Sequence, residues 1–371
     1  MIISVTLTSD TKEAIIADAL RSNLDQVDRF LVVHLVDDSK APDRTLQVAD
    51  EVAKGKLWIS DISMDGGMSV WRNKGLLAAA NLPGAAPGDY AVVTDTDERM
   101  AWNGLDLRAF LSQADPTVQA WDICSTTGTY TKGKVFRLPV QSSYRGSIHE
   151  EFGVKERLMP QVRFSELPKT TAFMGPYQEN NFTALQTQAA DEPDNPRWPY
   201  YLGHTLEVLK RFREAIPHFQ KALAMETHPG HSAWICFQIG VCHHLLQEPA
   251  EALAWCLKGM EHAPNYPELA WLAGVECILL RRWRAAIFWA RIALVHSWQG
   301  KSGPETERLG FRHPTGLFDG PWYVLGESYQ ALGNTAAENR CLLEVAQAKE
   351  ARESFFEHGI VIQRQQNQIF A

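Results

Sequence analysis

The 371-residue sequence lacks the marks of a disulfide-rich or membrane-spanning chain. Its six cysteines form no closely spaced C-x-x-C pair, so we expect them to be small reduced residues of the core. The apolar run 2–7 is too short for a membrane span or a signal sequence, and no basic segment precedes it. These absences predict a cytoplasmic protein with no membrane span.

An excess of basic residues is also missing. The chain has 36 Lys and Arg against 44 Asp and Glu, a net charge of −8, which does not favour duplex nucleic acid as a partner. Residues 8–12, after the first expected strand, offer no glycine-rich basic loop for a triphosphate. A nucleotidyltransferase is therefore the weaker hypothesis for an enzyme.

The chain is long enough for two domains, because one core rarely grows past about 250–300 residues. Up to about residue 165, β-rich runs alternate with helical segments, which predicts βαβ units and a largely parallel sheet. The runs lie at 2–7, 30–36, 57–59 and 90–93. The polar, proline-bearing segment 186–197 predicts a linker. We therefore expect domains at 1–185 and 196–371.

Beyond the linker, one pattern recurs three times. Gly203, Gly240 and Gly274 are each followed, 12, 16 and 19 positions later, by residues that suit close helix packing. These residues are Ala215, Phe219 and Ala222; Ala252, Cys256 and Gly259; and Ala286, Ala290 and Ala293. The glycines recur close to the roughly 34-residue period of tetratricopeptide repeats, which this half resembles. A degenerate fourth copy at Gly326 follows an expected inserted loop at about 298–314.

These repeats predict helical hairpins that bury their apolar faces against their neighbours. Helical spacing favours core packing for their Trp and Tyr residues. Repeat proteins of this kind bind extended peptides or partner helices in a groove, so a protein or peptide partner fits this half. A homodimer formed through the repeats is left open.

Two carboxylates follow the fourth expected strand. Asp95 and Asp97 come directly after the apolar run, at the edge where open α/β sheets bind their ligands. Hard carboxylate oxygens suit Mn²⁺ or Mg²⁺, and such a cation neutralises the charge of a departing diphosphate. The sequence therefore predicts a metal site that includes both residues. The alternative is a solvated turn whose acids favour the start of a helix.

The second strand also ends in acid, at Asp37 and Asp38. The run 36–45 resembles the "VDDgStDrT" signature of family-two glycosyltransferases of the GT-A fold, although 40–42 replaces the glycine-containing turn with one extra residue. The resemblance implies that Asp37 and Asp38 contact the nucleotide and that Asp95 contacts the ribose or sugar.

Arg72 and Asn73 open the helix before the fourth strand, much as that family places an "aRN.g" segment near the diphosphate. An arginine at this place suits a forked pair of hydrogen bonds to phosphate. An exposed helix arginine is the alternative.

The segment 144–151 resembles the "yrg.iHE" segment of glycosyltransferases that carry tetratricopeptide repeats. We expect His149 to be the third metal ligand, through a neutral imidazole. Glu150 is the expected general base, which takes the proton of the acceptor. Neighbouring strand residues point to opposite faces, so both roles require a bend there. A structural histidine beside two solvent-facing glutamates is the alternative.

The sequence thus predicts a GT-A Rossmann-like nucleotide-sugar domain of the α/β class, followed by an all-α domain of tetratricopeptide-like repeats. The leading hypothesis is a metal-dependent, inverting glycosyltransferase of the hexosyltransferase type. It would move a sugar from a nucleotide-diphosphate donor, expected to be a UDP-sugar, to a peptide, protein or glycan. The alternative is a catalytically inactive repeat scaffold that binds a protein or peptide partner.

Overall fold

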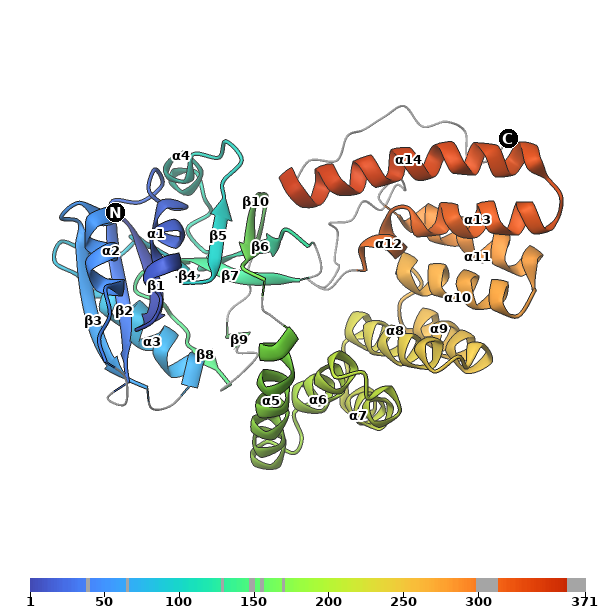
Figure 1. Ribbon diagram of the computed structural model, residues 1–371, viewed down its shortest axis with the longest axis horizontal. Coiled ribbons are helices and arrows are strands. Elements are labelled where there is room, and N and C mark those ends of the chain that lie inside the picture. The colour runs from blue at the N-terminus through green and yellow to red at the C-terminus, as the bar shows by residue number, and fades with distance from the viewer. Residues whose placement is uncertain are drawn as a thin grey trace. The chain divides into compact units, whose positions relative to one another are not determined.

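The computed structural model describes residues 1–37, 41–64, 67–127, 130–146, 151–153, 157–168, 171–297 and 313–358. The chain divides into an α/β unit, Met1–Lys169, and a helical unit, Thr170–Phe356 (Figure 1). The division falls before the expected domain end at 185, because helix α5 (Thr171–Asp191) packs against α6 (Arg197–Val208). The expected linker is therefore helical up to Asp191, and only a short proline-bearing turn follows it.

The first unit is built on an eight-stranded sheet in the order β3-β2-β1-β4-β7-β6-β10-β5 (Figure 1). The strands are β1 Ile2–Ser9, β2 Arg29–Val36, β3 Leu57–Ser63, β4 Tyr90–Asp95, β5 Glu98–Ala101, β6 Ala120–Ser125, β7 Thr131–Arg137 and β10 Arg157–Glu166. The first four strands in chain order pair in parallel, whereas β7 runs antiparallel to both β4 and β6. The sheet is thus mixed rather than largely parallel, because β6 returns to β7 directly, without the helical crossover that a parallel pair needs.

Both faces of this sheet are covered. The helices are α1 Glu13–Arg21, α2 Thr45–Ala53, α3 Gly67–Ala80 and α4 Leu107–Ser112. Successive strand residues point to opposite faces. Ile2 and Val32 pack with α1, α2 and α4, while Ile3 and Leu31 pack with α3 on the other side. A ligand of this unit therefore has access to the strand ends rather than to the faces.

The second unit is a series of helical hairpins that follow one another in chain order (Figure 1). Helices α6 and α7, α8 and α9, and α10 and α11 pair within the three repeat copies, which confirms the tetratricopeptide-like repeats. After α5 and α6, the helices are α7 Phe212–Met225, α8 Pro229–Leu245, α9 Pro249–His262, α10 Pro267–Leu279, α11 Trp283–His296, α12 Pro314–Leu317, α13 Gly320–Ala331 and α14 Thr335–His358. Most of the expected inserted loop lies outside the described residues.

The repeat glycines mark places where helices approach closely. A Cβ atom added to Gly203 would lie 2.8 Å from the ring of Phe219, and one added to Gly274 would lie 3.0 Å from Val324. Phe219 itself has no exposed surface. The fourth copy is looser, because a Cβ added to Gly326 would meet nothing nearer than Cys341, at 3.7 Å.

Each hairpin turns through a residue in the left-handed conformation, seven positions after the repeat glycine. These residues are Lys210 (φ 60°), Gln247 (φ 61°), Arg281 (φ 56°) and Gly333 (φ 72°). The next amide nitrogen then donates to a carbonyl five residues earlier, as in the bond from Arg211 to Leu206 at 2.8 Å. This is the Schellman geometry in which glycine is the usual residue. Only the fourth copy has glycine there.

Candidate functional site

Arg72 and Asp95, both predicted site residues, lie in direct contact. Arg72 on α3 donates from Nη2 to Oδ2 of Asp95, the last residue of β4, over 2.8 Å. Its guanidinium carbon lies 5.6 Å from the centre of the Tyr144 ring. Arg72 is buried, so the alternative of an exposed helix arginine is wrong. Oδ1 of Asp95 is buried and accepts no hydrogen bond from the described residues.

The side chain of Asn73, the neighbour of Arg72, forms two hydrogen bonds with the backbone of Tyr144. Its Oδ1 accepts from the nitrogen of Tyr144 at 2.7 Å, and its Nδ2 donates to the carbonyl of Tyr144 at 2.9 Å. Tyr144 belongs to β8 (Tyr144–Arg145), which pairs with β9 (Glu151–Phe152) in a separate two-stranded sheet. In this structure Asn73 therefore holds β8 in place beside Arg72.

A buried ion cluster supports the end of β4. Glu98 accepts from Lys132 at 3.0 Å and from Lys134, and it also accepts from the backbone nitrogen of Asp95 at 2.8 Å. Glu98 and Lys134 have no exposed surface. Burial would raise the pKa of Glu98, but the ammonium groups of Lys134 and Lys132 outweigh burial and lower it far below its usual range. No local pattern in the sequence predicted this cluster, because its two lysines lie on β7 and the acid lies on β5.

The other predicted carboxylates follow the ends of β2 and β4. Asp97 is half-buried in the turn between β4 and β5, where its carbonyl accepts from the nitrogen of Leu167 at 2.8 Å. Asp37 is half-buried directly after β2. Asp38 lies outside the described residues. The structure thus brings Asp95 together with Arg72, while the nucleotide contacts expected at Asp37 and Asp38 stay predictions.

The expected metal site is incomplete in the part of the chain that the structure describes. No three His, Cys, Asp or Glu side chains of that part gather in a way that would hold a metal ion. His149 and Glu150, the expected ligand and base, lie outside it. The ligand set of Asp95, Asp97 and His149 therefore stays a prediction.

Asp43, from the signature-like run, has a structural task. Its carboxylate accepts from the nitrogens of Thr11 at 2.8 Å and of Thr45 at 2.9 Å, at the starts of α1 and α2. Burial would raise the pKa of Asp43, but the hydrogen bonds from Thr45 and Thr11 lower it. Thr11 has a φ of 71°, a rare conformation for a β-branched residue. Asp43 thus joins two helix N-termini, which explains an acid there without a nucleotide.

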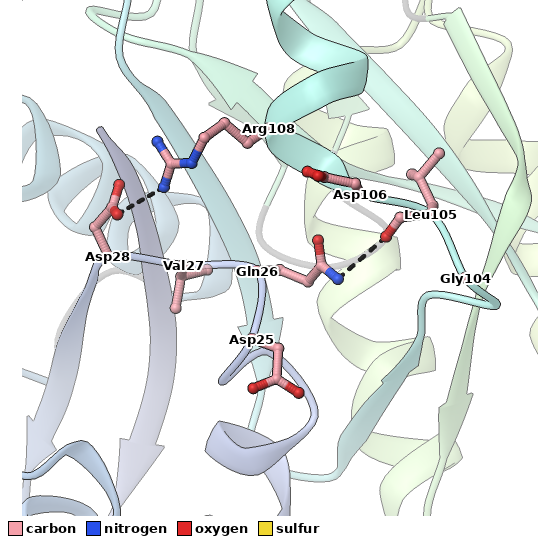
Figure 2. Close-up of a pocket in the computed structure, with 8 residues that line it drawn as sticks. All are labelled: Asp25, Gln26, Val27, Asp28, Gly104, Leu105, Asp106 and Arg108. Carbon is pink, nitrogen blue, oxygen red and sulfur yellow. Dashed lines mark hydrogen bonds and ion pairs between the residues drawn. The ribbon is translucent and has the colours of Figure 1, made fainter.

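A polar cleft of about 560 Å³ opens elsewhere on the first unit (Figure 2). It is lined by Asp25, Gln26, Val27, Asp28, Gly104, Leu105, Asp106 and Arg108. Figure 2 shows Asp28 paired with Arg108, at 2.6 Å, and Gln26 bonded to the carbonyl of Leu105, at 3.1 Å. No predicted site residue lines this cleft. It lies just before β2 begins, at the opposite end of that strand from Asp37.

The second unit exposes a row of aliphatic side chains that sequence reasoning missed. Val208, Leu245 and Leu279 are 44, 48 and 54% exposed, and they form what we call the aliphatic row. Each lies five positions after the glycine of its repeat, on the first helix of a hairpin. The signal in the sequence was an aliphatic residue at the same position of three repeat copies. It was missed because only the positions expected to be buried were compared.

Aromatic residues occupy another register of the same helices, three positions before each glycine. These residues are Tyr200, Phe237, Trp271 and Tyr323. Tyr200 is buried, as the helical spacing predicted for the tyrosines, and Phe237 is buried too, whereas Tyr323 is 40% exposed. Trp271 is half-buried and stacks on His313, with ring centres 4.8 Å apart.

Polar pairs link the first helices of neighbouring hairpins. Gln238 on α8 donates to Glu207 on α6 at 2.9 Å, and His244 on α8 contacts Glu276 on α10 at 2.7 Å. Burial raises the pKa of Glu207 to about 7. The hydrogen bond with Glu276 raises the pKa of His244.

The chain thus combines a mixed α/β unit with tetratricopeptide-like helical repeats. No family model matches it, and neither does any curated protein. Among solved structures, MamA is 13% identical over 50% of this chain and 97% of its own, with a TM-score of 0.39. YrrB, described as a TPR protein with an unusual peptide-binding site, is 15% identical over 47% of this chain and 79% of its own, with a TM-score of 0.36. PilF of Pseudomonas aeruginosa is 13% identical over 50% and 78%, with a TM-score of 0.36.

These comparisons correct the leading hypothesis from the sequence. The similar solved structures are repeat proteins, and no finding connects the chain with sugar transfer, so the prediction of a glycosyltransferase is wrong. The expected nucleotide-sugar donor has no support either. The likeness concerns repeat architecture alone. No helix among the described residues is long and apolar enough to cross a membrane.

Proposed function

We propose that the protein is a scaffold whose helical repeats bind an extended segment of a partner protein. The observation that carries this proposal is the aliphatic row. Val208, Leu245 and Leu279 expose about half of their surface at one register of three successive repeats. Scattered exposed aliphatics need no explanation, but a regular row on one set of helices is typical of an interaction surface.

The row suits an extended segment because its members sit on successive first helices. The first helices of neighbouring hairpins contact each other through Gln238–Glu207 and His244–Glu276. Packed helices lie about 8–10 Å apart, a distance that a few extended residues span. Covering the exposed half of each side chain contributes on the order of 1 kcal/mol. Three such contacts do not offset the entropy lost on association. The partner segment must therefore make polar contacts as well.

A peptide library tests the proposal. Phage-displayed random peptides of about 12 residues, which span roughly 40 Å when extended, are selected on the full chain. They are then compared on the variant Leu245→Ser/Leu279→Ser. The matched control is Leu342→Ser/Leu343→Ser, which changes two leucines of α14 that are 54 and 67% exposed and lie outside the row. We expect peptides that bind the wild type and the control and lose binding to the row variant. A selection that yields no row-dependent peptide overturns the proposal.

For the first unit, we propose a GT-A-like architecture with a divalent cation near Asp95 and Asp97, without a sugar-transfer role. The order β3-β2-β1-β4 and the acids that follow β2 and β4 support the architecture. The buried Oδ1 of Asp95 that lacks a hydrogen-bond partner supports a cation. Calorimetric titration with Mn²⁺ should give heat with the wild type and none with Asp97→Ala, and equal heats would remove Asp97 from the site.

A further inference from the structure

The turn between α10 and α11 concentrates positive charge. Arg281, Arg282 and Arg284, which we call the arginine turn, are all exposed. Within the described part of the second unit, none of their side chains forms an ion pair. The turn follows directly on Leu279, the most exposed member of the aliphatic row. Basic and apolar surface therefore adjoin at this end of the row.

At the first interface between repeats, two interfaces earlier, the equivalent arginine is paired with an acid. Arg213, ten positions after Gly203, pairs with Glu248, eight positions after Gly240. Arg284 holds the place of Arg213 in its own repeat, but the place of Glu248 in the following copy belongs to Asn334. An amide replaces the carboxylate, so the repeat architecture leaves the charge of Arg284 unbalanced.

The backbone at this turn places a cation where glycine is the usual residue. Arg281 has a φ of 56°, in the left-handed region that favours glycine, and Gly333 holds the equivalent place in the fourth copy. A helix C-terminus favours a cation, which offsets part of that preference. This interaction with the helix C-terminus does not explain the neighbouring Arg282 and Arg284, because Arg281 alone supplies the cation that the dipole of α10 favours.

We propose that the arginine turn binds a carboxylate-rich stretch of the partner segment whose apolar side chains cover Leu279. This inference rests on the proposed function and specifies the chemistry of the partner. Guanidinium groups form paired hydrogen bonds with carboxylates, and complementary charge selects the partner and its direction along the row. A protein segment fits better than nucleic acid, which needs a basic track along many phosphates, whereas this chain has a net charge of −8.

The row-dependent peptides provide the test. We expect their share of Asp and Glu to exceed that of the unselected library by about twofold. Synthetic analogues with Gln and Asn in place of those acids should bind the wild type about tenfold more weakly in fluorescence anisotropy. The variant Arg281→Gln/Arg282→Gln/Arg284→Gln should no longer distinguish a peptide from its amide analogue.

A variant with the same change in net charge provides the control. Lys221→Gln/Lys258→Gln/Arg340→Gln removes three exposed cations elsewhere on the second unit and should keep the preference for acidic peptides. Row-dependent peptides without an excess of acids would overturn the inference and leave the proposed function standing. An equal loss of the preference for acidic peptides in the control variant would also overturn the inference.

Two further outcomes also count against the inference. Binding of an oligothymidylate or of phosphatidylserine vesicles that depends on the arginine turn, while acidic peptides show no such dependence, would assign the turn to another class of ligand. A library without any row-dependent peptide would overturn the proposed function, and the inference would fall with it.

Discussion

Lys134 donates a hydrogen bond to Glu98, and neither side chain is exposed to solvent. Both charges have therefore left water and need compensation, which Lys134 receives from Glu98 and which Glu98 receives from Lys134 and from Lys132 at 3.0 Å. The pair lies beneath Asp95, whose backbone nitrogen donates to the same carboxylate at 2.8 Å. The ion pair thus sets the position of the residue at the end of β4.

Removing one partner of this pair should destabilise the first unit strongly. We expect Lys134→Met to lower the free energy of unfolding by about 3–5 kcal/mol, because it removes the buried partner of Glu98 and leaves that buried charge with Lys132, whose side chain is 31% exposed. The double variant Glu98→Gln/Lys134→Met should recover part of the loss, since no buried charge then remains at these two sites. Urea denaturation at pH 7 measures both effects. A loss below about 1 kcal/mol, typical of a surface change, would contradict this account.

Glu207 should make stability depend on pH in the neutral range. Its pKa is about 7 in the folded protein, because of burial, against 4.5 for an ordinary glutamate. The folded chain therefore holds a proton that the unfolded chain releases. The stabilisation is complete below pH 4.5 and is lost as the pH rises through about 7.

Glu207→Gln mimics the protonated side chain and tests this prediction. The variant and the wild type should be equally stable near pH 4.5, and the variant should be more stable at pH 8 by about 2–3 kcal/mol. His204, one turn earlier on α6, is present in both proteins, so its titration does not produce a difference between them. Glu261→Gln, at an exposed position of α9, is the control and should follow the wild type. If the free energy of unfolding changes with pH in the same way in Glu207→Gln and in the wild type, Glu207 is not the cause of a pH dependence.

Two repeat glycines should respond differently to the same substitution. Gly203→Ala should lower the free energy of unfolding by about 1–3 kcal/mol, because the new methyl group would lie 2.8 Å from Phe219 in a tightly packed core. Gly326→Ala should be neutral or stabilising by up to about 1 kcal/mol, since alanine favours a helix and the nearest atom is 3.7 Å away. Thermal denaturation of the two variants decides between this packing account and a general requirement for glycine.

The turn residues provide a test of backbone preference that is separate from binding. Arg281→Gly should raise the free energy of unfolding by about 0.5–1 kcal/mol, because glycine adopts the left-handed conformation without strain. Gly333→Ala, at the equivalent turn, should lower it by a similar amount. Denaturation midpoints of the two variants should therefore move in opposite directions. Midpoints that shift together would show that backbone preference does not distinguish the two turns.

Asp43 should act as a shared cap for two helices. Asp43→Ala should lower the free energy of unfolding by about 1–2 kcal/mol, because the nitrogens of Thr11 and Thr45 lose their acceptor. Asp43→Asn should cost less, since an amide oxygen still accepts one of these bonds. Urea denaturation compares them. If both variants match the wild type, the capping role is excluded.

Sequence reasoning succeeded where a pattern is local and failed where contacts are distant. The spacing after Gly203, Gly240 and Gly274 predicted the hairpins, since helix pairing repeats with the chain. Resemblance to a glycosyltransferase signature over 36–45 misled the functional hypothesis, because an acid in such a run can equally accept hydrogen bonds from the backbone where helices begin. In this structure Asp43 has that second task.

The sequence by itself determined the alternation of strands and helices in the first half and the hairpin repeat in the second. Both follow from the periodic direction of side chains along the backbone. Only the tertiary structure decided which charges meet. Arg72 and Asp95 are 23 residues apart, Thr11 and Asp43 are 32 apart, and Glu98 and Lys134 are 36 apart. Their contacts depend on strand order and helix packing, which no local period encodes.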